Sequence, residues 1–177
     1  MSRIRAILIT MVFVLAYAGP SIAGDVRLLA NQEYFPLLEE KIRSAGDEIL
    51  VSMYLFRTTD NERNLATRLR EDLISAASRG VKVTVLLEKE RRERKGASLN
   101  DDNRRTAALL SRGGVKVYFD SPDVTTHTKL VVIDRRFVFV GSHNFSDSAL
   151  GHNNEASVMV DSPEMAAKAA FFIKGIR

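Results

Sequence analysis

Hydrophobic and polar positions alternate along this chain with two different periods. Short runs of apolar, often β-branched residues have the length and composition of buried strands. These predicted strands cover residues 26–30, 48–56, 81–88 and 115–119. Between them, apolar residues recur every three or four positions, which predicts helices over residues 33–46, 61–80 and 101–112. Strands that alternate with helices in this way indicate an α/β domain.

The second half of the chain has a different pattern. Two apolar runs at residues 129–133 and 137–141 are separated by a short polar turn, which predicts a β-hairpin. Residues 155–160 form a later strand, and a closing helix starts after Ser162, a suitable N-cap. Together these elements predict one layered α/β/α sandwich around a mixed β-sheet.

The N-terminal segment has the organisation of an export signal. Two arginines precede an apolar run over residues 7–18, which is followed by small residues at Ser21 and Ala23. The run is shorter than the roughly 20 residues that span a bilayer. It therefore predicts a signal peptide over residues 1–23 and a mature domain over residues 24–177, periplasmic or secreted. The alternative is a retained membrane anchor.

Composition and charge narrow the possible chemistry. The chain contains no cysteine, so disulfides, thiolate metal sites and thiol redox chemistry are excluded. Its net charge is +4, and removal of Arg3 and Arg5 with the leader lowers this to +2, a weak argument for a nucleic-acid partner. A basic cluster at residues 88–95 could contact phosphates or form a solvated loop. Its basic residues are Lys89, Arg91, Arg92, Arg94 and Lys95.

A histidine and a lysine stand two positions apart where a predicted strand begins. At this spacing the side chains of His127 and Lys129 point to the same face, whereas Leu130 and Val132 point to the opposite face. An imidazole with a pKa of about 6.5 is a nucleophile near neutral pH, and a lysine brings positive charge to phosphate oxygens. The pair is therefore suited to approach one phosphoryl group.

A second polar segment follows the predicted hairpin. Gly141 lets the backbone turn tightly there, and Ser142 and Asn144 can donate hydrogen bonds to phosphate oxygens. Glu155, beyond this loop, carries a carboxylate that could orient an imidazole. The two segments thus offer a nucleophile, a cation and polar donors within about 30 residues of chain.

The spacing of these residues resembles the signature of the phospholipase D superfamily, the HKD motif. That signature is H-x-K-x-x-x-x-D, then six residues, then G-S-x-N. It is matched here by His127, Lys129, Asp134, Gly141, Ser142 and Asn144. The order of strands and helices over the mature chain is also similar to the Nuc-like branch of the family, small secreted bacterial endonucleases with one motif per chain. The resemblance implies a phospholipase D-like α/β fold.

This resemblance further implies a homodimer in which two motifs face each other and form one active site. A two-step displacement needs one imidazole as nucleophile and a second as acid, and the chain has a single His-x-Lys. A two-fold interface supplies the second copy. His127 of one chain would then form a phosphohistidine, while the partner's His127 protonates the leaving group and later activates water. Neither a metal ion nor a cofactor is required.

The remaining motif residues take their expected roles from the same resemblance. Lys129, Ser142 and Asn144 would hold the phosphate oxygens, and Glu155 matches a carboxylate that hydrogen-bonds a catalytic histidine. Asp134, in the hairpin turn, is expected to be mainly structural, capping the local backbone and pairing with the arginines that follow it.

Other interpretations stay open at this stage. The motif does not separate a nuclease from a phospholipase D that acts on phospholipid head groups, and a non-catalytic nucleic-acid or surface-binding module is a third hypothesis. The three histidines and Asp134 could form a metal site, although Lys129 would repel a cation there. A hydrolase triad of Ser142, His127 and Asp134 lacks the usual G-x-S-x-G sequence. The histidines left outside the predicted catalytic set are His143 and His152.

Overall fold

A computed structural model describes residues 25–91 and 98–176 of the chain. The predicted signal peptide, residues 1–23, and the part of the basic cluster beyond Arg91 lie outside the described residues. Among the helices in the described ranges, none is long and apolar enough to cross a bilayer.

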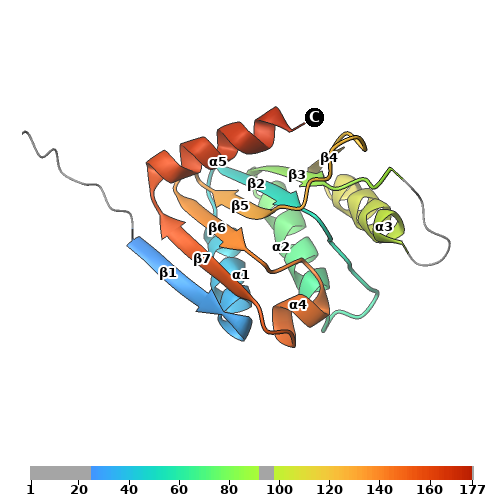
Figure 1. Ribbon diagram of the computed structural model, residues 1–177, viewed down its shortest axis with the longest axis horizontal. Coiled ribbons are helices and arrows are strands. Elements are labelled where there is room, and N and C mark those ends of the chain that lie inside the picture. Colours follow the sequence, from blue (N-terminus) through green and yellow to red (C-terminus); the bar gives the residue numbers. More distant parts are fainter. Residues whose placement is uncertain (1–24, 92–97, 177) are drawn as a thin grey trace, which may run out of the picture.

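The described residues form a seven-stranded mixed sheet in the order β1-β7-β6-β5-β2-β3-β4 (Figure 1). The strands are β1 (Asp25–Ala30), β2 (Glu48–Met53), β3 (Lys82–Leu87), β4 (Lys116–Phe119), β5 (Lys129–Ile133), β6 (Phe137–Gly141) and β7 (Ala156–Asp161). Strand β2 pairs parallel with β3 on one side and antiparallel with β5 on the other. β2 therefore joins a parallel half of the sheet to an antiparallel half, which confirms the predicted mixed sheet.

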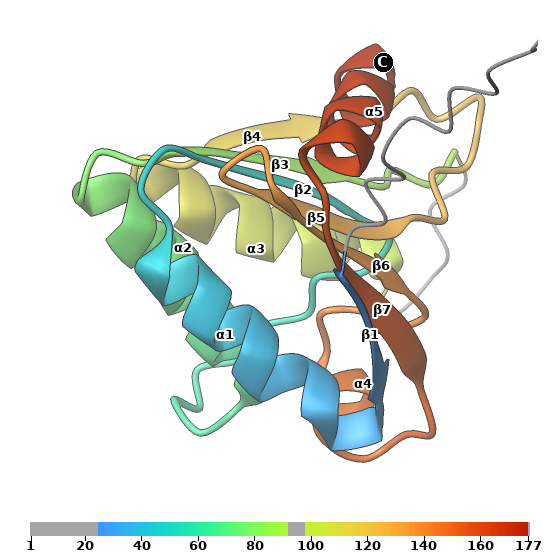
Figure 2. The same ribbon diagram turned by 90° about the vertical axis from the view of Figure 1, so that its left-hand side faces the viewer.

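Helices cover both faces of this sheet (Figure 2). They are the 3-10 turn η1 (Asn31–Glu33), α1 (Tyr34–Ser44), α2 (Leu65–Ser78), α3 (Leu99–Arg112), α4 (Asp147–Gly151) and α5 (Pro163–Gly175). The helices α1, α2 and α3 lie on one face, and α5 lies on the other (Figure 2). The result is the predicted α/β/α sandwich.

Alternate residues of β5 supply two separate cores. Val131 is fully buried in the larger core, between the sheet and α1–α3. Leu130 and Val132 point the other way and pack with Ala166 and Ile173 of α5. This alternation follows from the two-residue period of a strand, and it places Lys129 on the same face as Val131.

Polar caps fix where the helices begin. The Asn64 side chain accepts a hydrogen bond from the backbone N–H of Thr67 at 2.9 Å, so α2 starts at Leu65 rather than near residue 61 as predicted. At the last helix the predicted cap is confirmed, because Ser162 Oγ accepts from the N–H of Met165 at 3.3 Å. The five-residue helix α4 was not predicted, since it is too short to show a helical period.

Candidate active site

The predicted pair lies together at one end of the sheet. Lys129 is the first residue of β5, and its Nζ lies 3.1 Å from His127 Nε2 and 3.2 Å from the His127 carbonyl oxygen. The lysine is only 7% exposed, whereas the histidine is exposed. A protonated lysine has donors and no acceptor, so Nε2 must accept this bond and the ring proton sits on Nδ1. The nitrogen that faces Lys129 therefore keeps its lone pair.

A tyrosine that the sequence analysis did not select completes this corner. The Tyr54 ring meets the His127 ring edge-on, with centroids 4.4 Å apart at 65°. Lys129 Nζ lies 4.9 Å from the centre of the same ring, a cation–π distance. Tyr54 directly follows β2, the strand that pairs with β5. In the sequence, the position of Tyr54 at the end of an apolar run could have indicated a place near the end of a buried strand. The residues around Tyr54 gave no indication that it contacts His127.

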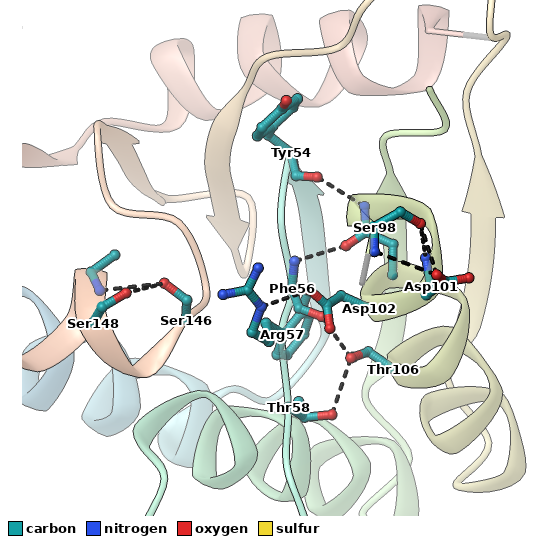
Figure 3. Close-up of polar contacts among 12 residues, drawn as sticks. Tyr54, Phe56, Arg57, Thr58, Ser98, Asp101, Asp102, Thr106, Ser146 and Ser148 are labelled. Carbon is teal, nitrogen blue, oxygen red and sulfur yellow. Dashed lines mark hydrogen bonds and ion pairs between the residues drawn. The ribbon is translucent and has the colours of Figure 1, made fainter. Parts of the chain in front are cut away.

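The segment that carries Tyr54 is fixed to helix α3 (Figure 3). Asn103 donates to the Tyr54 carbonyl oxygen at 2.8 Å and accepts from the Phe56 N–H at 2.8 Å. Thr106 Oγ1 donates to the Phe56 carbonyl oxygen at 2.6 Å, and Arg57 pairs with an aspartate of the same helix (Figure 3). The backbone beneath Tyr54 is thus held by paired polar groups, which keeps the ring against His127.

Burial and charge set the protonation of the pair. Partial desolvation by its packed neighbours lowers the pKa of His127 below its ordinary value, and the neighbouring Lys129 charge lowers it further. Burial also lowers the pKa of Lys129, and the negative charge of Glu155 opposes that shift. Both effects on the imidazole favour its neutral form, which is the form that can attack phosphorus.

We therefore expect the His127 imidazole to titrate below pH 6.5, measured by NMR in the folded protein. Lys129→Met removes a positive charge from 3.1 Å away, so the midpoint should rise toward 6.5. Lys168→Met is the matched control, because Lys168 is an exposed α5 lysine paired with Glu164. Equal midpoints in wild type and K129M would show that the lysine does not influence the imidazole.

Ser142 and Glu155 contact each other rather than the histidine. The Ser142 hydroxyl donates to a Glu155 carboxylate oxygen and accepts from the N–H of Ala156 at 3.0 Å. The other carboxylate oxygen accepts from Asn153 Nδ2 at 3.1 Å. In the described residues of a single chain, Glu155 makes no hydrogen bond to His127. The expected orienting bond is therefore not formed within one chain.

Gly141 and Asn144 are packed more tightly than the sequence indicated. Gly141 is the last residue of β6, and a Cβ there would lie 2.4 Å from the Cα of Ser157 on β7. Glycine is required by this close approach of two strands, not by the tight turn that was predicted. Asn144 is half-buried, and its Oδ1 has no hydrogen-bond partner among the described residues.

Asp134 lies at the other end of β5, about 20 Å from His127 at 3.3 Å per residue. Its φ is 51°, and its carboxylate accepts from the N–H groups of Gly46, Asp47 and Glu48 at 2.9–3.1 Å. These partners lie almost 90 residues away, so the prediction of a local cap paired with the neighbouring arginines is wrong. Those arginines, Arg135 and Arg136, pair instead with Asp47 and Asp161.

The other proposed chemistries do not assemble. The distant position of Asp134 rules out the triad of Ser142, His127 and Asp134. The other two histidines have different surroundings from His127. His143 is fully buried, and His152 pairs with Asp147 at 3.6 Å on the surface. Within residues 25–91 and 98–176 there is no group of three or more candidate metal ligands. In the described part of the basic cluster, Arg91 Nη1 lies 3.9 Å from Oδ1 of the exposed Asp123.

Two buried carboxyl groups lie beneath the loop that carries His127. Glu88, 2% exposed, accepts a hydrogen bond from the N–H of Thr126, the residue before the histidine. Asp120, 5% exposed, lies beside it and accepts from the N–H of Lys89 at 2.7 Å. Burial and then the contact with Asp120 raise the pKa of Glu88 to about 7. Glu88 therefore keeps its proton up to near-neutral pH.

This pair gives stability a definite pH dependence. Glu88 binds its proton more tightly in the folded state than in the unfolded state, so stability should fall as pH rises from about 4.5 through about 7. Glu88→Gln keeps the shape of the protonated carboxyl group and should reduce that fall. Between pH 5 and pH 8, the Tm of E88Q should drop by roughly 3 °C or more less than the Tm of the wild type. Calorimetry of both proteins tests this, with Glu40→Gln at an exposed helix position as control. Parallel Tm curves for wild type and E88Q would contradict it.

The described residues form an α/β domain, a mixed sheet between helices, with a histidine and a lysine paired where one strand begins. The family model described as "Cardiolipin synthase, PLD-like domain" matches residues 38–174, well over half of the chain. The chain therefore belongs to the phospholipase D superfamily of phosphodiesterases.

Comparison with known proteins agrees with this assignment. Phospholipase D from Rickettsia felis is 33% identical over 94 residues, which are 53% of this chain and 43% of that protein. The alignment thus spans less than half of this relative. Nuc, a phospholipase D family member from Salmonella typhimurium, has a TM-score of 0.69 at 22% identity and covers 85% of this chain and 91% of its own. NucT from Helicobacter pylori has a TM-score of 0.67 at 21% identity, covering 86% and 94%. The resemblance to the Nuc-like branch is confirmed in the fold.

Proposed function

We propose that this protein is a metal-independent phosphodiesterase that cleaves nucleic-acid phosphodiester bonds through a phosphohistidine and works as a homodimer. The observation that carries the proposal is the His127–Lys129 pair, with Nε2 and Nζ 3.1 Å apart and surroundings that lower the pKa of the imidazole. The lysine charge supplies the electrostatic stabilisation that phosphoryl transfer requires. Export through the predicted signal peptide to the periplasm or the medium is part of the proposal.

The chemistry uses two imidazoles. Phosphate oxygens draw Lys129 Nζ away from the ring, which frees the Nε2 lone pair for attack on phosphorus. A P–N bond forms, the P–O bond to the leaving oxygen breaks, and the partner's His127, which must enter this step as the protonated imidazolium, gives that oxygen a proton and becomes neutral. The same partner imidazole then takes a proton from water, whose oxygen attacks phosphorus and releases His127. Ser142 and Asn144 would position the oxygens.

Exposed apolar side chains, some of them beside His127, support the two-fold assembly. Among the described residues, eight large hydrophobic side chains are more than 40% exposed. They are Val26, Leu28, Tyr118, Val124, Val140, Met165, Phe171 and Phe172. One hollow is lined by His127 together with Val124 and Phe172. Exposed apolar patches of this kind mark interaction sites, and a second copy seated here would bring another His127 close. An orienting bond from Glu155 to a histidine would then reach the partner's His127.

The substrate is tested by direct cleavage. The mature chain, with chelator present, is incubated with plasmid DNA over a range of salt concentrations and separately with phosphatidylcholine vesicles. We expect nicking or linearisation of DNA that His127→Asn abolishes. Absence of DNA cleavage at every salt concentration ends the nuclease proposal. Release of choline from the vesicles would favour the alternative, a phospholipase D, which the family description and the exposed apolar side chains also fit.

Mixed dimers test the shared site. Differently tagged wild-type and H127N chains are refolded together, and heterodimers are purified through both tags. Because each reaction needs both imidazoles, heterodimers should retain about 1% of wild-type activity or less. Activity in proportion to the wild-type chains would show that one chain suffices. If wild type and H127N bind nucleic acid equally and the wild type cleaves none, the hypothesis of a non-catalytic binding module is supported instead.

A further inference from the structure

The geometry points to Asn31 and His143 as positioning residues that fix Glu155 in the active site. Neither residue belongs to the predicted machinery, and Asn31 lies more than 90 residues before the motif. The inference rests on the proposed function in one respect: Glu155 must serve the phosphodiesterase reaction.

Asn31 holds both backbone groups of Glu155. Its N–H donates to the Glu155 carbonyl oxygen at 2.8 Å, and its side-chain Oδ1 accepts from the Glu155 N–H at 2.9 Å. This two-way grip requires Asn31 to adopt a φ of 52°, in the left-handed region that asparagine tolerates better than most residues. A residue at the end of the first strand thereby sets the backbone of a residue 124 positions later.

His143 holds Asn31 in that conformation. The Asn31 carbonyl oxygen can only accept, so His143 Nε2, 3.0 Å away, carries the ring proton and donates it. His143 Nδ1 then accepts from the Ser157 hydroxyl at 2.7 Å. The ring is fully buried and stacks on Tyr34, with centroids 4.2 Å apart and planes within 6°. Burial lowers the pKa of His143, which keeps this neutral arrangement. The buried histidine thus does not face substrate, and its bond to Asn31 links it to Glu155.

The chain of contacts ends at the reacting groups. Glu155 accepts from the Ser142 hydroxyl, and its charge acts on the buried Lys129. A shift of about 1 Å at Glu155 would therefore misplace a phosphate ligand and weaken the field at the lysine, and displacements of this size can cost about 100-fold in rate. We expect the loss in kcat rather than in KM, because Lys129 still binds the phosphate while the alignment of the reacting groups is lost.

Two substitutions at Asn31 separate the hydrogen bond from the backbone. Asn31→Gly tolerates the positive φ but has no Oδ1, so kcat should fall about 10- to 100-fold with KM within about two-fold. Asn31→Asp keeps an acceptor at the same place and should stay within about three-fold of wild type. Gln32→Ala is the matched control, because Gln32 lies in the same turn and bonds the Gly151 carbonyl oxygen instead.

Variants of His143 test the second step. His143→Phe keeps a ring against Tyr34 but loses both hydrogen bonds, and it should reproduce the kcat loss of N31G. His143→Gln can still donate to the Asn31 carbonyl oxygen and should recover part of the activity. In a Glu155→Gln background, N31G should add no further loss, because both changes act through the same carboxylate. Additive losses would overturn the assignment.

Amide hydrogen exchange tests the inference without an activity measurement. The Glu155 amide should exchange at least about tenfold faster in N31G than in wild type, at unchanged Tm, and Q32A should leave it unchanged. Equal exchange in N31G and wild type would refute the grip of Asn31 on Glu155. If the wild type cleaves no phosphodiester, the proposed function fails, and the exchange data still show whether Asn31 positions Glu155.

Discussion

Replacing His127 with asparagine is expected to lower kcat/KM for phosphodiester cleavage by about 10⁴-fold or more. Loss of a nucleophile that acts in concert with other groups costs on this order in well-studied hydrolases. Asparagine is similar in size and polar, so it can sit beside Lys129 and Tyr54 without emptying the corner. It cannot form the P–N bond or transfer the proton, and in a dimer it removes both imidazoles at once.

Steady-state kinetics with DNA or a chromogenic phosphodiester measure this loss, and substrate binding by H127N should persist because Lys129 is intact. His152→Asn is the matched control, since His152 is exposed and its side chain pairs with Asp147. Retention of more than a tenth of wild-type activity by H127N, or by His127→Ala, would remove this residue from the nucleophile's role.

Replacing Gly141 with alanine is expected to destabilise the fold by about 3 kcal/mol or more. The added methyl group would lie 2.2 Å from Ser157 Oγ, 2.4 Å from Ser157 Cα and 2.5 Å from the Ala156 carbonyl oxygen. Two of these atoms belong to the β7 backbone, so relief requires β6 and β7 to separate rather than a side chain to rotate. Overpacking against fixed atoms costs in this range.

Urea denaturation measures this change, and Gly46→Ala is its control. Nothing lies within 4 Å of a Cβ at Gly46, and its φ is not positive, so G46A should stay within about 0.5 kcal/mol of wild type. A G141A protein as stable as wild type would show that the two strands can move apart here. We expect G141A also to lose activity, because the separated strands carry Ser142 and Glu155.

Local patterns in the sequence were sufficient for the hairpin and for the central pair. Residues 129–133 and 137–141 form strands as predicted, because their alternate residues face two different apolar cores. His127 and Lys129 meet because a strand returns every second side chain to the same face. These features depend on neighbours in the chain, and spacing alone determines them.

Contacts between distant residues were beyond such patterns. Tyr54, Glu88 and Asn31 are single residues without a period, and each reaches the site only after β2, β3 or β1 has taken its place in the sheet. Asp134 shows the same limit, because its three backbone partners precede it by more than 80 residues. The predicted contact from Glu155 to His127 is not formed among the described residues of one chain, where the Glu155 carboxylate bonds Ser142 and Asn153 instead.

The pairing of β1 with β7 has a consequence for synthesis. The register joins Asp25 to Asp161 and Ala30 to Ala156, so β1, the first strand described, can join the sheet only when β7, the last strand, has been made. The parallel strands β2, β3 and β4 can pair earlier, but the groups around Glu155 cannot come together before β7 has been synthesised. The surroundings of Glu155 are therefore assembled late, after residues 156–161 have been synthesised and have paired with β1.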